Sequence, residues 1–426
     1  MTEVAISTDV RVRPRLTLGL LSVQHALIHG QAALYPLVYL AIIAEFGVSA
    51  GTIALLAAAG SLLTGFLQLP FGGLTRVFSR RALLGAGGAL VGVTTAALSM
   101  AGSFVVFAIV GVISRIGGAP QHPVGNALIA EQYPEHRRGF AISAHIAGGN
   151  VGTVVIGFVA AAAIATIGWR TTVLLLGLPA LVVAIAILLF IRESGADRAS
   201  AREAGTVRNA YRRVLADGNL RWLFLSSVLG GGARGLGVLN LFVPLYLTVV
   251  IGLPIGTVGI MYAVLLAASV PGPLVAGWLS DRIGRKPLIV GVYVAGASSL
   301  ALFVLVGDDP LGLWIAIVLL SCFSFVESPQ LQALLADVTP SALRDAAYST
   351  YFALAFGVGS LWVLLYGAIV ETAGQGIGLP LVFWVMAAAS IVAALSVLPI
   401  RIHPAGAGLD TRQVEADPAG APNSDA

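Results

Sequence analysis

The chain has 426 residues, of which 58% are hydrophobic and 10% are charged, and its mean hydropathy is +0.93. Soluble globular domains carry about 25% charged residues, so this composition excludes them and indicates a polytopic membrane protein. The net charge of +4 does not predict nucleic-acid binding, because most of the cations lie in the connections on one side of the membrane. Cys322 is the only cysteine, which excludes an intrachain disulfide.

Residues 1–15 are polar, and no small-residue cleavage site follows the first apolar run. We therefore expect a retained transmembrane helix there and not a cleaved signal peptide. Twelve runs in all are long enough to cross a bilayer, which takes about 20 apolar residues. They cover residues 16–44, 50–76, 82–101, 104–131, 139–167, 170–190, 221–250, 256–280, 287–306, 311–336, 343–370 and 378–400. The predicted fold class is an all-α polytopic membrane protein with 12 transmembrane helices.

The polar, Arg-rich segment between the sixth and seventh runs divides the chain. We expect a six-helix half over 1–191, a cytoplasmic linker over 192–220 and a second six-helix half over 221–402. The remaining segment, 403–426, is rich in Ala, Gly, Pro and Asp without apolar periodicity, so it is predicted to be a disordered cytoplasmic tail.

The Lys and Arg residues are distributed asymmetrically. Of 24, 21 lie in segments that a single topology places on one side, Arg115 and Arg234 lie within apolar runs, and Arg170 lies on the other side. Cations accumulate in cytoplasmic connections, so the pattern predicts a multi-pass protein of the cell inner (plasma) membrane with both termini cytoplasmic.

The two halves contain an internal repeat. Residues 72–81 correspond to 277–286 at an offset of 205, and residues 123–134 correspond to 329–340 at an offset of 206. Two matches at almost one offset indicate duplicated six-helix halves, since repeats at a fixed interval mark duplicated structural units. Transporters built from parallel repeats hold their substrate near the bilayer midplane, between the halves.

The segment from Gly277 to Lys286 reads Gly-Trp-Leu-Ser-Asp-Arg-Ile-Gly-Arg-Lys and resembles the loop signature of the major facilitator superfamily. The resemblance implies alternating access, with Asp281, Arg282 and Arg285 as gating residues that hold one closed state. The first-half copy has Arg76 where the family usually has an acid. Arg76, Arg80 and Arg81 in that copy are therefore expected either to gate or to anchor lipid headgroups.

Within the superfamily, the first five runs resemble fosmidomycin-resistance-type exporters. The resemblance rests on residues 25–46, on Gln121-His122-Pro123, and on residues 138–143 leading into Gly148-Gly-Asn-Val-Gly152. Arg115-Ile-Gly-Gly-Ala is similar to the fourth-helix signature of drug–proton antiporters, although Phe158 stands where their fifth helix has Pro. These resemblances imply export of a small compound, and cations such as Arg115 would suit an anionic one.

Two ionisable residues lie near the middle of their runs, where charge is costly and usually functional. Glu327 and Arg234 are both expected about 15–20 Å from the cytoplasmic surface, at 1.5 Å per helical residue. A buried carboxylate can change its protonation state when an Arg approaches, so we predict proton coupling at Glu327 with Arg234 as partner. The alternative is a static pair of Glu327 with Arg234 or Arg115 that only locks helices.

Four histidines lie in runs of the first half, and His25 and His29 share a helix face as an i, i+4 pair. Together with Arg115, Asn150 and Arg234, the residues His25, His29, His122 and His145 are predicted substrate contacts. The histidines could instead relay protons or make structural hydrogen bonds. No metal is expected, because an i, i+4 pair without nearby Cys or carboxylate is a weak ligand signal.

The sequence therefore predicts a secondary transporter, not an enzyme, without a cofactor. The favoured function is proton-coupled efflux of a small, possibly anionic, organic compound or drug. The alternatives are proton-linked uptake of an organic acid or sugar and, from another class, a transporter-derived membrane sensor without transport. The expected partners are a small-molecule substrate, protons and the lipid bilayer, and the expected state is a monomer.

Overall fold

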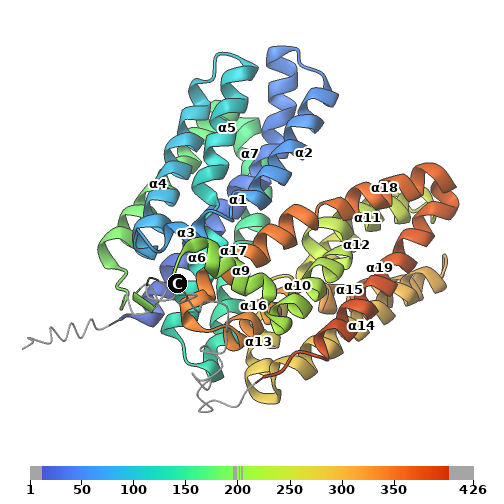
Figure 1. Cartoon of the computed structure of the whole chain (residues 1–426). Helices are drawn as coiled ribbons and strands as arrows, with labels where there is room; N and C mark the ends of the chain where they lie inside the picture. Colours follow the sequence, from blue (N-terminus) through green and yellow to red (C-terminus); the bar gives the residue numbers. More distant parts are fainter. Residues whose placement is uncertain (1–11, 195–198, 201, 203–204, 403–426) are drawn as a thin grey trace, which may run out of the picture.

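A computed structural model describes residues 12–194, 199–200, 202 and 205–402 (Figure 1). The predicted disordered tail, 403–426, lies outside these residues, as does part of the expected linker. Every regular element of the described chain is helical, and twelve helical segments within it are long and apolar enough to cross a membrane. The predictions of an all-α fold and of twelve spans are confirmed. In chain order the spans are Pro14–Phe46, Leu55–Leu74, Arg80–Met100, Phe104–Gln132, Glu135–Ile156, Ala162–Phe190, Gly218–Val249, Gly256–Ile283, Arg285–Leu305, Pro310–Val338, Ser341–Ala373 and Gln375–Val397.

The first half, spans one to six, ends in one long helix that reverses direction at Gly168. Gly168 has φ 77° and ψ 159°, a conformation that favours glycine and turns the chain between spans five and six. The elements are α1 (Pro14–Phe46), α2 (Ala50–Phe66), α3 (Phe71–Leu74), α4 (Arg80–Ala97), η1 (Leu98–Met100), α5 (Phe104–Gly118), α6 (Gln121–Gln132) and α7 (Glu135–Phe190).

The second half, spans seven to twelve, follows a short helix that lies in the predicted linker, α9 (Val207–Ala216). Its elements are α10 (Gly218–Gly230), η2 (Gly231–Ala233), η3 (Gly235–Leu239), α11 (Asn240–Val249), α12 (Ile255–Ala267), α13 (Pro271–Ile283), α14 (Arg285–Leu305), α15 (Pro310–Phe323), α16 (Glu327–Val338), η4 (Ser341–Leu343), α17 (Arg344–Phe352), η5 (Ala353–Val358), α18 (Leu361–Ala373) and α19 (Gln375–Val397).

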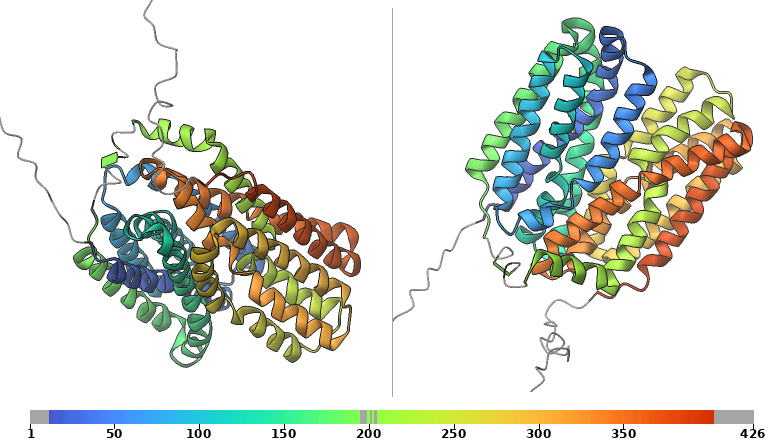
Figure 2. Two further views of the ribbon diagram at one scale, coloured as in Figure 1. Left: turned by 90° about the horizontal axis from the view of Figure 1, so that it is seen from below. Right: turned by 45° about the horizontal axis from the view of Figure 1, so that its top comes forward.

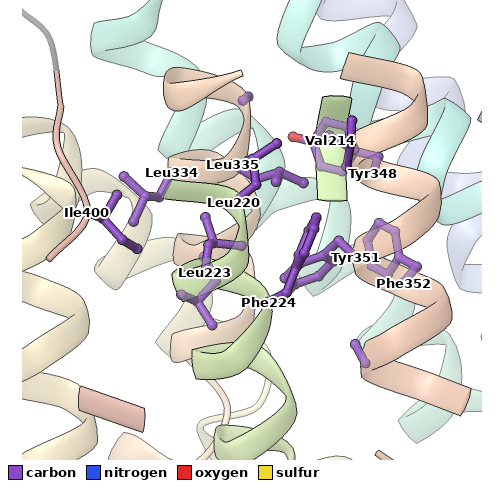
Figure 3. Close-up of a cluster of buried hydrophobic side chains, with 14 of the residues drawn as sticks. Val214, Leu220, Leu223, Phe224, Leu334, Leu335, Tyr348, Tyr351, Phe352 and Ile400 are labelled. Atoms are coloured by element: carbon purple, nitrogen blue, oxygen red, sulfur yellow. The ribbon is translucent and has the colours of Figure 1, made fainter. Parts of the chain in front are cut away.

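The two halves meet at the end of the molecule where α9 lies and diverge toward the opposite end (Figures 1 and 2). We call these the linker end and the far end. A buried cluster at the linker end attaches α9 to the second half through Val214, which packs with side chains of α10, α16 and α17 such as Leu220, Leu335 and Tyr348 (Figure 3). The tyrosine of α9, Tyr211, donates a hydrogen bond to the Leu69 carbonyl of the first half, and burial raises the pKa of Tyr211 to about 12, so this donor stays protonated at neutral pH.

Several spans are interrupted, and the interruptions position polar residues. Span four breaks between α5 and α6, so His122 lies in the first turn of α6. Span ten breaks in the corresponding place, between α15 and α16, and Glu327 begins α16. In span seven Arg234 has extended backbone angles between η2 and η3. Non-helical backbone at membrane depth is tolerated where it is buried in protein or lines a cavity.

Candidate functional site

A cavity of about 400 Å3 lies mainly within the first half, and we call it the Arg115 cavity. It is lined by side chains of spans one, two, three, four and eleven, among them His29, Tyr35, Thr64, Arg115, His122 and Phe356. Its size is in the range of small-molecule sites, and its lining combines apolar side chains with a few polar groups, as such sites do.

Arg115 brings a positive charge to this cavity without an acidic partner among the described residues. Its Nη1 donates to the Thr64 hydroxyl at 3.1 Å, and its guanidinium carbon lies 5.9 Å from the centre of the Tyr35 ring. Because the guanidinium cannot lose its proton, the uncompensated charge is suited to an anion in the cavity.

Four imidazoles meet beside this cavity, and we call them the histidine cluster: His25, His29, His122 and His145. His25 Nδ1 lies 2.8 Å from the backbone oxygen of His145, and His25 Nε2 lies 3.0 Å from His29 Nε2. His29 Nε2 lies 3.5 Å from His122 Nε2. The His145 ring stacks on His25 with 4.4 Å between ring centres. The structure thus brings all four predicted histidines together, although the sequence placed only His25 and His29 on a common helix face.

Small residues on α7 allow this convergence. A Cβ added to Gly149 would lie 2.9–3.1 Å from atoms of the His25 ring, and one on Gly152 would overlap the backbone of Ala26. Close approach through glycine is a common way for helices to pack in a membrane. The glycine run of span five therefore lets α1 lie directly against α7 and places His25 over Gly149.

The second half contains the predicted buried ion pair. Arg234 Nε donates to Glu327 Oε1 at 2.9 Å, and 15% and 5% of the two side chains are exposed. Arg234 Nη2 also donates to the Ser227 carbonyl at 3.4 Å. Of the two static partners that the sequence left open for Glu327, the structure selects Arg234, whereas Arg115 bonds to Thr64.

The repeat relates this pair to the first half. Arg234 follows His29 by 205 positions, the offset of the loop repeat. At the offset of 206 that relates 123–134 to 329–340, Glu327 corresponds to Gln121, the neighbour of His122, and both residues begin a helix after a break in their span. The corresponding places therefore hold an ion pair in the second half and uncharged or imidazole side chains in the first.

Asn150 lies apart from the Arg115 cavity. Its amide nitrogen donates to the Ser269 carbonyl at 2.5 Å, across the two halves. It lines a second cavity of about 400 Å3 together with Asn240 and Tyr262 of the second half. Arg234 and Glu327 likewise do not line the Arg115 cavity, so the predicted substrate contacts are divided over three places.

A network of charges closes the linker end around the second-half loop. The Asp281 carboxylate accepts hydrogen bonds from the backbone N–H groups of Gly139 and Phe140 on α7, at 3.0 and 2.9 Å. Arg285 bonds to Asp281 at 2.5 Å and to Asp337 at 3.0 Å. A further Arg285 nitrogen donates to the Glu135 carbonyl at 2.7 Å, again across the halves. Asp337 also pairs with Arg138 of the first half.

Two glycines permit this closure. A Cβ on Gly139 would lie 2.7 Å from both Asp281 and Ser280, and a Cβ on Gly277 would lie 2.8 Å from the Gly139 carbonyl oxygen. The helices α7 and α13 thus cross with backbone against backbone. Of the three residues predicted to gate, Asp281 and Arg285 lie at that crossing, whereas Arg282 stacks on Trp278 with 3.8 Å to the ring centre.

The first-half loop supplies a second network that sequence reasoning left undecided. Arg80 forms a two-point ion pair with Asp345 of α17, with nitrogen–oxygen distances of 2.9 and 2.8 Å, and also pairs with Glu131. Asp345 and Glu131 were not predicted. The repeat contained the necessary signal, since Arg80 and Glu131 precede Arg285 and Asp337 by 205 and 206 positions.

One hydrogen bond joins the halves between residues that the repeat relates to one another. Asn126 donates to the side-chain oxygen of Gln332 at 2.7 Å, and the two positions differ by 206. A residue that contacts its own counterpart lies close to the axis that relates the two copies. Asn126 and Gln332 therefore mark this axis, on the linker-end side of the Arg115 cavity.

Comparisons with known proteins agree with this architecture. A family model described as Major Facilitator Superfamily matches residues 21–363. The solved structure of the E. coli fucose:proton symporter FucP superimposes with a TM-score of 0.74 over 92% of this chain and 98% of that chain, at 15% sequence identity. At that identity the likeness shows the fold.

Three relatives are similar in sequence. A probable L-galactonate transporter of Escherichia coli (strain K12) is 28% identical over 278 residues, and the match spans 60% of this chain and only 61% of that relative's length. A cis,cis-muconate transport protein of Acinetobacter baylyi is 24% identical over 70% of this chain and 73% of its own length. A nitrite extrusion protein of Bacillus subtilis is 25% identical over 63% and 66%.

The family model covers well over half of the chain, and the twelve spans and the paired linker-end networks agree with it. The protein is therefore a multi-pass membrane transporter of small molecules and not an enzyme. The chain belongs to the Major Facilitator Superfamily.

Proposed function

We propose that this transporter carries a small organic carboxylate together with protons, taking the anion into the cell. The observation that carries this proposal is the Arg115 guanidinium, which faces a cavity of about 400 Å3 without an acidic partner among the described residues. A cation at membrane depth is costly, and a carboxylate that binds there would compensate its charge with strong, charge-assisted hydrogen bonds.

The names of the relatives support an anionic substrate. L-galactonate, cis,cis-muconate and nitrite are all anions at neutral pH. None of these three proteins is named as a drug exporter, so we propose carboxylate transport in place of the drug efflux expected from the sequence. The nitrite extrusion protein, and the resemblance to fosmidomycin-resistance-type exporters, favour export as the second candidate direction.

Proton coupling is assigned to Glu327 and Arg234. A buried carboxylate paired with an arginine can accept a proton only if the pair separates, so protonation and the geometry of the second half are coupled. Protonated Glu327 would free Arg234 within the protein interior. A substrate anion could then be attracted by both halves, which explains why proton and anion would move together.

The linker-end networks supply the gate in this proposal. We assign the linker end to the cytoplasm, so the structure is closed on the inside, with the halves joined by a linker between residues 192 and 220. Opening to the inside requires the loss of the Asp281, Arg285 and Arg80 contacts between the halves. These contacts are made in one state and lost in the other, which is what an alternating-access gate requires.

Purified protein in liposomes that contain a pH-sensitive dye tests the proposal. L-galactonate, cis,cis-muconate, nitrite, xylose and a lipophilic cationic drug are added separately against an imposed pH gradient. We expect proton entry with a carboxylate and not with xylose or the drug. We expect Arg115→Gln to raise the KM for the carboxylate roughly 10- to 100-fold, the loss of about one charge-assisted hydrogen bond.

Ile116→Ala is the matched control, because this exposed neighbour does not line the Arg115 cavity. Equal transport by the Arg115→Gln variant and the parent would refute the role of Arg115. Proton flux that only the cationic drug drives would refute carboxylate transport and indicate drug–proton exchange. Proton exit on carboxylate addition would establish export.

A further inference from the structure

The histidine cluster contains a nitrogen–nitrogen contact that separate two-centre hydrogen bonds do not explain. The backbone oxygen of His145 can only accept, so His25 Nδ1 carries the proton and the Nε2 atom of neutral His25 is a bare acceptor. His29 Nε2 must then donate to it across 3.0 Å. A protonated ring nitrogen of neutral imidazole has no lone pair left, so the same His29 Nε2 cannot accept from His122 Nε2, which lies 3.5 Å away.

A metal ion would satisfy all three nitrogens at once. His29 and His122 make their ring-nitrogen contacts through Nε2, and ligand atoms of His25, His29 and His122 all lie within 4.8 Å of one another. Zn–N bonds of about 2.0–2.1 Å in a tetrahedron separate neighbouring nitrogens by about 3.3 Å. Two of the three separations, 3.0 and 3.5 Å, lie on either side of that value, and the ligand atoms of the third pair, His25 and His122, lie within 4.8 Å of one another.

The surroundings of His25 also fit a metal site. Metal-binding histidines usually donate their other ring nitrogen to a carbonyl or carboxylate, which fixes the ring. His25 does this through Nδ1 to the His145 carbonyl, and its ring is held between His145 and Gly149. His29 and His122 border the Arg115 cavity, so a fourth ligand could reach the ion from there.

We propose that His25, His29 and His122 form a binding site for a divalent transition-metal ion of the Zn2+ class, with its fourth position open to the Arg115 cavity. Sequence spacing did not predict it, because His122 is 93 residues from His29 and only the fold joins them. Imidazole ligands suit Zn2+, Ni2+ and Cu2+, whereas Mg2+ and Ca2+ prefer oxygen, so the ligand set defines the class of ion.

The charge of such an ion would link it to the anion. The aromatic rings that contact His122 from the second half, Phe352 and Phe356, are uncharged, and Arg115 adds a further positive charge to the same cavity. A carboxylate bound between the ion and Arg115 would balance both. This part of the inference rests on the proposed function and predicts that metal and anion each raise the affinity for the other, as linkage requires.

The test uses full-length protein from which the affinity tag has been removed, because a polyhistidine tag would bind metal itself. Zn2+ binding is measured by titration calorimetry and by metal content after dialysis, and Co2+ is used as a spectroscopic probe of coordination. We expect one ion per chain, a visible Co2+ spectrum of a four-coordinate site, and at least about 100-fold weaker binding in His29→Gln and His122→Gln. The matched control is His136→Gln, an exposed histidine outside the cluster that should bind as the parent does.

The outcomes separate this inference from the proposed function. Absence of stoichiometric Zn2+ binding in the parent, or unchanged binding in His29→Gln and His122→Gln, overturns the metal site even if carboxylate transport is found. Should either variant fail to fold, the Co2+ spectrum of the parent decides, and a six-coordinate spectrum overturns the proposal. Metal binding that cis,cis-muconate does not strengthen overturns only the linkage to the anion.

Discussion

Replacement of Asp281 by Asn should shift the protein away from the state described here. The Asp281 carboxylate accepts two backbone N–H groups from the other half and also holds Arg285. Its side chain is only 8% exposed, so water does not replace these bonds freely. An asparagine side chain offers one neutral acceptor oxygen in place of two charged ones. The variant therefore loses about one inter-half bond to a charged group and weakens the other.

The size of the shift follows from these contacts. A hydrogen bond to a charged group is worth about 1.5–3 kcal/mol, so we expect the balance between the two states to move by about 2–3 kcal/mol. At 1.4 kcal/mol per factor of ten this is roughly 30- to 150-fold. A population ratio of about 99:1 in favour of the closed linker end would fall to between about 3:1 and 2:3, which pulsed electron paramagnetic resonance can detect.

Spin labels at the far end report the change. With Cys322 replaced by Ser, labels at Met100→Cys and Leu311→Cys lie at exposed positions at the far ends of spans three and ten, 84% and 68% exposed. Asp281→Asn should add a population with a shorter label distance, because the far end closes as the linker end opens. Arg282→Gln is the control in the same loop, and it should leave the distances unchanged. A distance distribution for Asp281→Asn that coincides with the parent's would show that the carboxylate does not hold the gate.

Three further variants test other parts of the structure. Glu327→Gln should abolish proton-driven accumulation while counterflow exchange of the carboxylate continues, and an unchanged pH dependence of transport would rule out its coupling role. Gly149→Ala should displace the His25 ring and raise the KM for the carboxylate. The control is Gly111→Ala, whose added Cβ has no neighbour closer than 3.8 Å and which should transport as the parent does. Equal KM values for the two variants would contradict the packing argument. Arg80→Gln should cost about 3–5 kcal/mol of stability because it breaks a buried ion pair, and the thermal unfolding midpoint should fall. Arg81→Gln should change the stability by about 0.5 kcal/mol or less. Similar unfolding midpoints for the two variants would count against the Arg80 network.

The spans and the repeat could be predicted because they depend on hydropathy and on sequence offset alone. The pairing of Arg234 with Glu327 was also predicted as one of two possibilities, since both residues lie at one depth in the same half. What the sequence could not supply is the rotation of each helix about its axis. Rotation decides that Asn150 bonds to Ser269 and does not face the Arg115 cavity, and that His25 and His122 meet.

The first-half loop shows a different limit. Because Arg76 departs from the family pattern, the sequence leaves gating and lipid anchoring as equal alternatives for Arg80. The structure shows that Arg80 keeps its contacts through Glu131 and Asp345, which lie in other spans. The loop segment therefore supplies the charge, but its partners lie in other spans and correspond between the two halves only through the repeat.

The first part of α7 connects the histidine cluster to the linker-end network. Gly139 receives Asp281 at one end and Gly149 supports His25 at the other, and ten helical residues between them span about 15 Å. A tilt of only about 10° about the Gly149 end would move the Gly139 end by about 2.6 Å, at 1.5 Å of rise per residue. Added to the present Gly139–Asp281 distance of 3.0 Å, a displacement of that size away from Asp281 breaks the hydrogen bond, which weakens beyond about 3.2 Å. Any change at the histidine cluster that tilts this segment would therefore break the Asp281 contacts, so one helix couples the cluster to the gate.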